Sequence, residues 1–443
     1  MAHYSPLMVG GWAAKKMLMK GFQKGVFMLL LGCGSMNASA QQIIIQLKNQ
    51  LPVARKNELI ELDRSFLEKR LGKLSEDVPL EIIGRKAPGA VQFDDLDGDG
   101  KWEKAVLLCD FKARETVKLK LALTGDIVVS AGVLAHVRQR RKRYDDSFGK
   151  DLLADTVPAG QPNTDFTKVK LPPFLTEGPG WENDKVGFRI YMDVRNIKDI
   201  WGKTTSAMMM DTVGVDPSNV YHHLAPWGMD ILAVGKSLGA GSLALSVPVA
   251  GKADTLVRLG GIHMGKIIYR RIADGPVRAV FQMQYPAWNV LGNGKLTSLT
   301  EQISIWGGQY FYESKVSLKN APPGARLVTG IVNLKSKKAV RDSISNPSVL
   351  YTFDQQSENN DNLGMAVMLK KTDLIAFGQA PNAGSDILNT YTVKMKLPAA
   401  KQSVSFRYYA AWEHSDPAFS AEGGFKKFLG NQAKAYNSPI LIK

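Results

Sequence analysis

Alternation of apolar and polar residues, which begins after residue 42, constrains the fold of this chain more than any other feature of its sequence. The clearest alternating runs lie at 117–123, 188–194 and 404–412. A period of two places successive side chains on opposite faces of a β-strand. Turn signals such as Asn293-Gly294 separate such runs at the spacing expected of β-sandwiches. Helical periodicity is confined to about 64–71 and 424–436, so we predict a mainly β protein.

A polar, proline-containing stretch divides the chain into two parts of unequal size. The segment 43–145 contains short strands of its own and ends in a basic run, and residues 146–175 have a composition that seldom packs a core. Residues 176–443 continue without a comparable break, and a chain of this length usually exceeds a single core. We predict a small N-terminal β-sandwich domain at 43–145, a linker at 146–175 and a large C-terminal β domain at 176–443.

Residues 1–40 have the organisation of a secretory signal peptide. Four lysines precede a short apolar run at 26–31, and the small residues Ala38-Ser39-Ala40 follow as a cleavage site. We therefore predict a signal peptide and a periplasmic location. Acylation of Cys33 is the alternative, and it predicts a lipid-anchored envelope protein. No later segment reaches about 18 consecutive apolar residues, so we predict no transmembrane segment.

Charge and cysteine content narrow the partners and the source of stability. With Cys33 in the signal region, the mature chain has one cysteine, Cys109, which excludes an intrachain disulfide. The formal net charge is +16, and removal of the four signal-region lysines leaves about +12. We predict an acidic oligosaccharide or another anionic envelope polymer as the partner, and no nucleic acid. The alternative is that the charge reflects only the generally basic character of envelope proteins.

An acidic turn at residues 95–103 is a candidate for a hard cation. Asp95, Asp97 and Asp99 alternate around a glycine turn, and carboxylate oxygens are the ligands that Ca²⁺ prefers. The spacing departs from an EF-hand, because Val106 occupies the position of the bidentate glutamate. The alternative is a hairpin turn with Asx hydrogen bonds and no ion. We predict a structural Ca²⁺ site at these three aspartates.

Polar side chains share one face of the strand predicted at 186–194. Arg189, Tyr191 and Asp193 alternate with apolar residues, so the three point in the same direction. Such a row forms either a ligand-binding surface or a self-satisfied polar face that contains an Arg–Asp pair.

The segment 221–230 carries the highest density of reactive side chains. Adjacent histidines, His222 and His223, point to opposite faces if they lie on a strand, so only one of them faces a given site. The remaining histidines lack metal-ligand spacing, which argues against zinc. The glycine-rich segment after Lys236 lacks the Walker pattern, and the common hydrolase and zinc-protease motifs are missing from the sequence.

Several ordered motifs resemble the domain-of-unknown-function family numbered four-eight-six-one. They include 181–184 leading into 189–193, 227–230 followed by 235–239, 274–279, 306–310 and 408–412. The resemblance implies a galactose-mutarotase-like β-supersandwich preceded by an N-terminal β-sandwich, encoded in polysaccharide-utilisation loci. It also implies a relation to an ulvan-pathway oligosaccharide dehydratase. Lys104-Ala105 departs from the family pattern after Glu103, and this departure weakens the calcium prediction.

We predict a carbohydrate-active lyase or dehydratase that acts on uronate-containing oligosaccharides and requires no cofactor. Elimination beside a carboxylate needs a cation to neutralise it, a base for the proton on carbon five and an acid for the leaving oxygen. The predicted catalytic residues are His222 or His223 as base and Tyr191 or Tyr221 as acid. The predicted substrate-binding residues are Arg189, which pairs with the carboxylate, Asp193, Trp227, Asp230 and Lys236. The alternatives are a non-catalytic glycan-binding protein, a glycoside hydrolase and a sugar epimerase.

Overall fold

The computed structural model describes residues 42–76, 80–83, 90–123, 132–217, 221–251, 253–343 and 345–443. The predicted signal peptide and Cys33 lie outside the described residues. Residues 40–443 belong to one compact unit. Among the described residues, no helix combines the length and the apolar character needed to cross a membrane.

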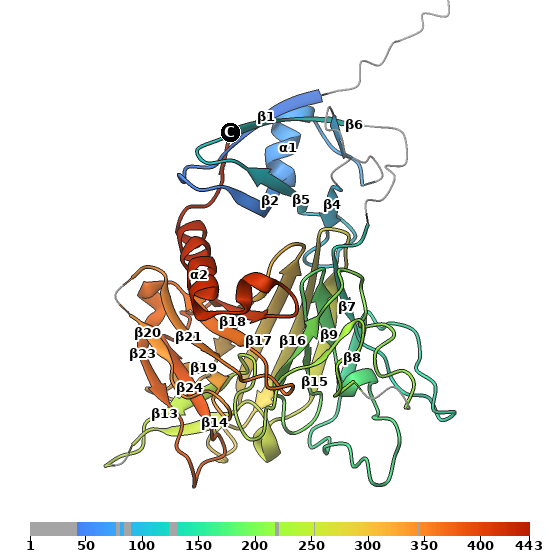
Figure 1. The fold of residues 1–443 in the computed structure, drawn as a ribbon. Coiled ribbons are helices and arrows are strands. Elements are labelled where there is room, and N and C mark those ends of the chain that lie inside the picture. The colour runs from blue at the N-terminus through green and yellow to red at the C-terminus, as the bar shows by residue number, and fades with distance from the viewer. Residues whose placement is uncertain are drawn as a thin grey trace, which may run out of the picture. The chain divides into compact units, whose positions relative to one another are not determined.

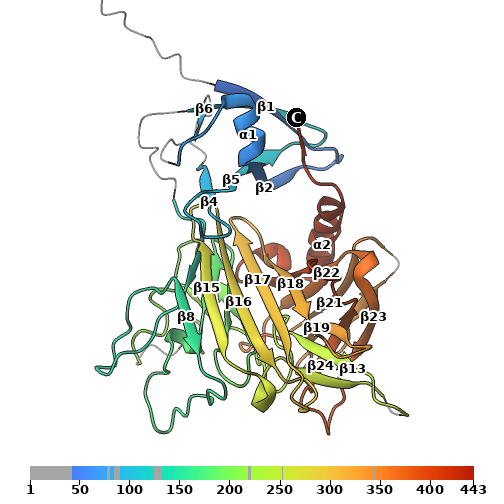
Figure 2. The ribbon, with the colours of Figure 1, turned by 180° about the vertical axis from the view of Figure 1, so that it is seen from behind.

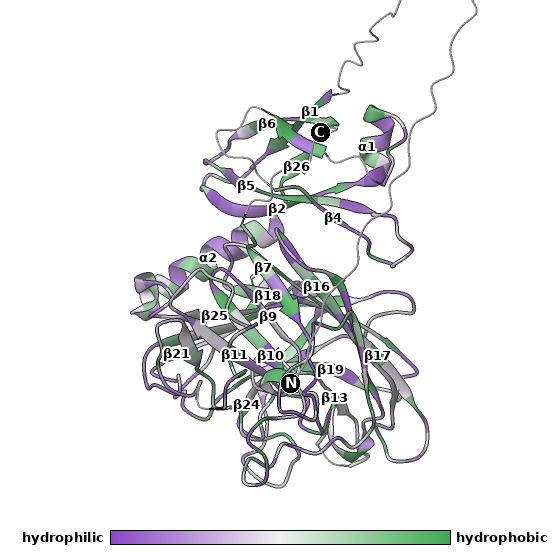
Figure 3. Ribbon diagram, turned by 90° about the vertical axis from the view of Figure 1, so that its right-hand side faces the viewer, coloured by the Kyte–Doolittle hydropathy of each residue, from purple (hydrophilic) through white to green (hydrophobic). Residues whose placement is uncertain are grey.

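The largest layer is a nine-stranded antiparallel sheet. In spatial order its strands are β20 (Val340–Asp342), β21 (Ser348–Asp354), β22 (Leu363–Leu369), β25 (Val404–Trp412), β18 (Phe311–Lys319), β17 (Thr297–Trp306), β16 (Arg278–Trp288), β15 (Ile267–Ala273) and β8 (Ala154–Val157). Figure 2 shows β15 to β18 side by side. Figure 3, coloured by hydropathy, shows hydrophobic and hydrophilic residues along the same strands, as period-two patterning requires.

Two five-stranded sheets share a core with this layer. The first has the order β12 (Gly228–Asp230), β11 (Lys198–Lys203), β10 (Val186–Ile190), β9 (Gly180–Asn183) and β7 (Ala135–Arg138). The second has the order β14 (Thr255–Arg258), β13 (Ala244–Val247), β19 (Arg326–Val332), β24 (Thr390–Met395) and β23 (Leu374–Gln379). One hydrophobic cluster joins Phe188 and Leu327 of these sheets to Ile303 and Val367 of the nine-stranded sheet. This packing makes the larger part a β-sandwich and confirms the predicted mainly β class.

The N-terminal part is a second, smaller sandwich. Its two sheets have the orders β26 (Leu441–Ile442), β1 (Gln42–Lys48), β6 (Thr116–Leu123), β3 (Leu80–Ile83) and β2 (Arg55–Asp63), β5 (Lys104–Phe111), β4 (Gln92–Asp94). Their buried side chains pack together with helix α1 (Arg64–Leu71), and Cys109 lies in this core. The last strand, β26, pairs with β1, and Figure 1 marks the C-terminus beside it. The end of the chain therefore completes the N-terminal sheet.

Helix α2 (Glu422–Asn437) precedes that last strand and packs on the nine-stranded sheet. Phe425 and Leu429 are buried in a cluster that includes Phe311 and Tyr409 of the sheet. Both helices lie where their periodicity predicts them. Within the described ranges, four short 3₁₀ turns complete the elements: η1 (Leu175–Glu177), η2 (Gly261–His263), η3 (Lys371–Asp373) and η4 (Pro417–Phe419).

Strand pairing crosses the domain limits that the sequence predicts. β7 falls in the predicted N-terminal domain but pairs with β9, and β8 falls in the predicted linker but pairs with β15. Val137 and Val157 are fully buried in the core of the larger part. Each of these four-residue strands buries a single valine, which leaves little periodic signal, and this is why the composition of the stretch resembles a linker.

Candidate functional site

A group of charged side chains lies on the face of the β12–β7 sheet that points away from the core. Phe188, Ile200 and Met229 point into the core from β10, β11 and β12. Alternation therefore directs Arg189, Asp199 and Asp230 to the opposite face. Arg189 and Asp199 are direct partners in the β10–β11 ladder. Three strands thus bring one arginine and two carboxylates to one place.

The guanidinium of Arg189 is enclosed by these partners. Its Nη2 donates to Asp230 Oδ2 at 2.6 Å, to Asp199 Oδ2 at 2.8 Å and to the hydroxyl of Tyr191 at 2.7 Å. Tyr191 in turn donates to Asp199 at 2.9 Å, and the Arg189 side chain is only 2 % exposed. Burial first, and then the charge of Asp199, raise the pKa of Asp230 well above its usual range. Two carboxylates that share one guanidinium can therefore retain a proton.

Tyr221 and His222 form the accessible edge of this group. The Tyr221 hydroxyl accepts from Arg189 Nη1 at 3.5 Å, and the rings of Tyr221 and His222 are 4.6 Å apart. His222 Nδ1 lies 3.6 Å from Asp230 Oδ2, and its side chain is 59 % exposed. We call Arg189, Tyr191, Asp199, Tyr221, His222 and Asp230 together the arginine cluster.

Protonation states at this edge favour proton transfer. Burial, and then the positive charge of Arg189, lower the pKa of His222, so its imidazole is neutral at neutral pH. Burial raises the pKa of Tyr221, so its phenol stays protonated. A neutral base and a protonated acid are therefore neighbours on an exposed edge.

The structure brings together five of the residues predicted for the site: Arg189, Tyr191, Tyr221, His222 and Asp230. Arg189 and His222 contact the same oxygen of Asp230, so their separation lies well within the roughly 12 Å reach of one sugar ring. Tyr191 is 5 % exposed and both of its hydroxyl contacts are internal, which leaves Tyr221 as the tyrosine at the accessible edge.

Four other predicted residues lie apart from that edge. Trp227 is mostly buried and packs against Trp201, whose ring also contacts the ring of Tyr221. Asp193 pairs with Arg195 at 2.5 Å. His223 is exposed, and no hydrogen bond or ion pair joins it to the arginine cluster within the described ranges. Lys236 is exposed, and its carbonyl accepts from Arg258 in a different part of the sheet layer.

The residues predicted from the sequence do not include three that the structure places in this region: Asp199, Glu177 and Glu358. Asp199 could be found only by pairing β11 with β10, because its role depends on the register opposite Arg189. Glu177 is buried, and its Oε2 lies 3.7 Å from Arg189 Nη1. Its other carboxylate oxygen pairs with Arg195 at 2.6 Å. Glu358 reaches the site from the loop after β21, where its amide donates to the carbonyl of Ile231. That contact joins segments more than a hundred residues apart and has no local signal.

The predicted calcium residues do converge. Asp95, Asp97, Asp99 and Glu103 each place a carboxylate oxygen within 4.8 Å of the others. Asp95 accepts hydrogen bonds from the amides of Gly98 at 2.5 Å and Gly100 at 2.9 Å. Such side-chain to backbone bonds are those of the alternative prediction, a turn with Asx hydrogen bonds. Four hard oxygen donors suit Ca²⁺, so the donor set fits the predicted ion and calcium remains a proposal.

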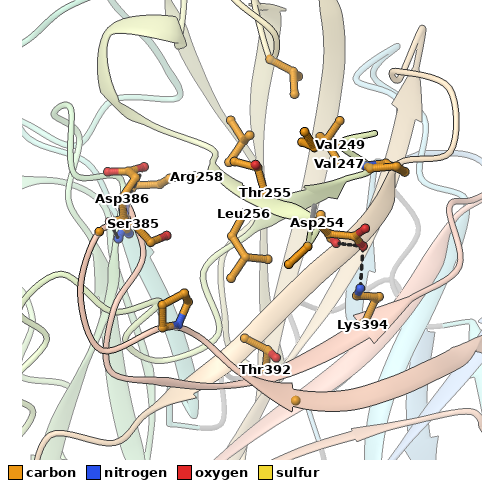
Figure 4. A pocket seen from close by; sticks show the side chains of 18 of the residues that line it. Val247, Val249, Asp254, Thr255, Leu256, Arg258, Ser385, Asp386, Thr392 and Lys394 are labelled. Carbon is orange, nitrogen blue, oxygen red and sulfur yellow. Dashed lines mark hydrogen bonds and ion pairs between the residues drawn. The ribbon is translucent and has the colours of Figure 1, made fainter. Parts of the chain in front are cut away.

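A separate groove of about 1260 Å³ lies over the second five-stranded sheet, where Figure 4 shows its side chains. Strands β13, β14, β23 and β24 contribute to its lining, together with the loop that contains Ser385 and Asp386. The groove lacks the adjacent histidine and tyrosine of the arginine cluster, and its polar side chains include Asp254, Lys394 and Arg258.

The fold and the cluster define a class: a two-sandwich, mainly β protein with an enclosed arginine and an accessible histidine–tyrosine edge. The chain belongs to the family described as Domain of unknown function (DUF4861), whose profile matches residues 47–442. This membership confirms the family that the sequence motifs indicate.

Relatives and solved structures resemble the chain to different extents. A protein called "Uncharacterized protein P7" from Formosa agariphila is 23 % identical over 417 residues, which cover 90 % of this chain and 92 % of the relative. An alpha-mannosidase from Enterococcus faecalis V583 covers 91 % of this chain at 11 % identity with a TM-score of 0.43. A glycosyl hydrolase family 38 protein from Enterococcus faecalis covers 91 % at 10 % identity with a TM-score of 0.45. The chain spans about half the length of each of these two structures.

Proposed function

We propose that the protein is a carbohydrate-active lyase or dehydratase that acts on uronate-containing oligosaccharides. The observation that carries this proposal is the contact between exposed, neutral His222 and partly buried, protonated Tyr221. Elimination requires a base and an acid beside the same sugar ring, and these two side chains supply both.

In the proposed reaction, His222 removes the proton on carbon five, next to the substrate carboxylate. The C–H electron pair forms the double bond between carbons four and five, and the bond from carbon four to its oxygen breaks. Tyr221 donates a proton to that oxygen, which leaves as a sugar hydroxyl in a lyase or as water in a dehydratase. Asp230 lies beside the His222 ring and positions it, His222 releases the proton it has taken to solvent, and solvent returns a proton to Tyr221.

In this proposal Arg189 does not pair with the substrate carboxylate, which is the role predicted for it from the sequence. Its donors are occupied by Asp199, Asp230 and Tyr191, so pairing with a substrate carboxylate would require breaking buried ion pairs. We assign it to positioning Asp230 and the Tyr221 hydroxyl.

Lys335 is the cation that we assign to the substrate carboxylate. Its side chain is 29 % exposed and lies 3.6 Å from Glu358, whose backbone is bonded to Ile231 next to Asp230. Its ammonium also donates to the carbonyl of Ser357 at 2.7 Å and to Asn360 Oδ1 at 3.2 Å, so it is held on the loop of Glu358 while its side chain stays partly exposed.

Incubation with acidic oligosaccharides tests the proposal. A lyase product absorbs in the ultraviolet because of its unsaturated uronate, and a dehydratase product is lighter by one water. We expect His222→Ala to lower turnover by about a hundredfold or more, and Tyr221→Phe to lower it similarly. His223→Ala is the matched control and should retain activity. Equal activity of the two histidine variants would overturn the assignment, and retention of glycans without turnover would favour the glycan-binding alternative.

Export is part of this proposal, because residues 1–40 have the organisation of a secretory signal peptide. We propose a periplasmic protein with a mature N-terminus near Gln41. Intact-mass analysis of the exported protein tests this position, and an acylated N-terminus at Cys33 would favour the lipid-anchored alternative.

A further inference from the structure

The groove over the β14–β23 sheet contains a buried cation, Arg258, to which no described carboxylate oxygen comes within hydrogen-bond distance. The Arg258 side chain is only 6 % exposed. Its hydrogen bonds run to the carbonyls of Ser237 at 2.8 Å, Lys236 at 2.7 Å and Asp386 at 3.2 Å. The nearest described carboxylate is that of Asp386, which is 3.7 Å from Nε and 61 % exposed.

Among the described buried arginines, Arg258 differs from Arg189 and Arg278 and resembles Arg138, which is also held by carbonyl oxygens but does not line this groove. Arg189 and Arg278 each contact a carboxylate at 2.6 Å or less. Burial lowers the pKa of Arg258, and the distant Asp386 does not restore it. A buried charge is costly unless it is paired. An anionic ligand in the groove would supply the missing partner.

A second cation lies at the other end of the groove. Lys394 donates to Asp254 at 2.8 Å and is 31 % exposed, and Ser246 also holds Asp254 at 2.6 Å. Figure 4 shows Arg258 and Asp386 on one side and Asp254 and Lys394 on the other. Arg258 and Lys394 therefore lie on opposite sides of the groove (Figure 4).

The lining between the cations suits sugar hydroxyls. Its accessible neutral hydrogen-bonding side chains include Thr255, Gln379 and Ser385, whereas Thr392 is mostly buried. A volume of about 1260 Å³ exceeds the range of roughly 300–1000 Å³ that is typical of small-molecule pockets, so the ligand is extended. Protein partners favour buried tryptophan, tyrosine and arginine anchors, and the described lining has no tryptophan or tyrosine.

We propose that this groove binds an acidic oligosaccharide, with Arg258 and Lys394 receiving carboxylate or sulfate groups at two separate sugars. This inference is independent of the elimination chemistry, because none of the arginine-cluster side chains lines the groove. The net charge of the chain favours the same class of ligand.

Calorimetric titration of the full chain at low salt tests the proposal. The probes are hexagalacturonate for carboxylates, a sulfated carrageenan hexasaccharide for sulfates and maltohexaose as the neutral control. We expect one acidic probe to bind, maltohexaose to bind at least tenfold more weakly, and Lys394→Ala to weaken the acidic probe about fivefold to tenfold. Lys396→Ala, which changes an exposed lysine just beyond the same strand, is the matched control.

Two further variants keep the test decisive. Arg258→Gln, checked for folding by its melting temperature, should also weaken binding, while His222→Ala should leave it unchanged. The proposal is overturned if neither acidic probe binds, if maltohexaose binds equally well, or if binding depends on His222 and not on Lys394. Failure of elimination activity would not affect the result, so the two proposals fail separately.

Discussion

His136 provides a sharp test of the electrostatics next to the arginine cluster. Its ring bridges two carboxylates, with Nδ1 3.0 Å from Asp274 and Nε2 3.2 Å from Asp211. Burial alone would lower the pKa of His136, but the two carboxylates outweigh it and raise the pKa to about 10. His136 is therefore an imidazolium at neutral pH, and it ties β7 to the segment that supports Tyr221.

The free energy involved follows from the difference between the folded and unfolded pKa. The pKa of His136 is raised from 6.5 to about 10 in the folded protein. At about 1.4 kcal/mol per pH unit, this difference corresponds to roughly 5 kcal/mol of unfolding free energy. The Asp211 side chain is 44 % exposed, so water screens part of it, and we expect about 2–3 kcal/mol. Because the folded pKa is raised, this stability is complete below about pH 6.5 and is lost as the pH rises through about 10.

Urea unfolding followed by tryptophan fluorescence measures the effect. Other groups also titrate near pH 10, so the quantity of interest is the difference in unfolding free energy between the native chain and His136→Gln. We expect that difference to be about 2–3 kcal/mol near pH 7 and to approach zero above pH 10. His263→Gln, at an exposed histidine, is the control and should show no such trend. A difference for His136→Gln that stays constant with pH would refute the reasoning.

Three other outcomes are expected. Activity should increase with pH through a midpoint below 6.5, because burial and Arg189 lower the pKa of His222; a midpoint above 6.5 in the pH–rate profile would contradict this. Calcium at about a hundred times its Kd should stabilise the native state by about 2.7 kcal/mol, and melting curves should show no calcium effect in Asp97→Asn. Lys203→Met should cost about 3–5 kcal/mol in urea unfolding, because Glu182 would remain buried without its cation, and the added change Glu182→Gln should recover part of that loss.

Local sequence patterns predicted the class of fold and part of the site. Alternation identified the strands, and 3.6-residue periodicity located both helices, because the direction of a side chain depends on the backbone conformation of its own segment. The same alternation put Arg189 on the opposite face from Phe188, which the structure confirms. The clustering of reactive residues in 221–230 also indicates His222 and Tyr221 as residues of the site.

Tertiary structure alone decided how those side chains are used. Arg189 is enclosed because β11 brings Asp199 opposite it and β12 adds Asp230, and strand register is a long-range property. Lys335 pairs with Glu358, and the amide of Glu358 donates to the carbonyl of Ile231, which is adjacent to Asp230. The groove is likewise lined by strands that are more than a hundred residues apart in the sequence. The sequence determines which face a residue occupies, whereas packing between distant segments determines whether its charge is buried, paired or accessible. Those three properties decide whether an arginine binds a ligand or holds a neighbour in place.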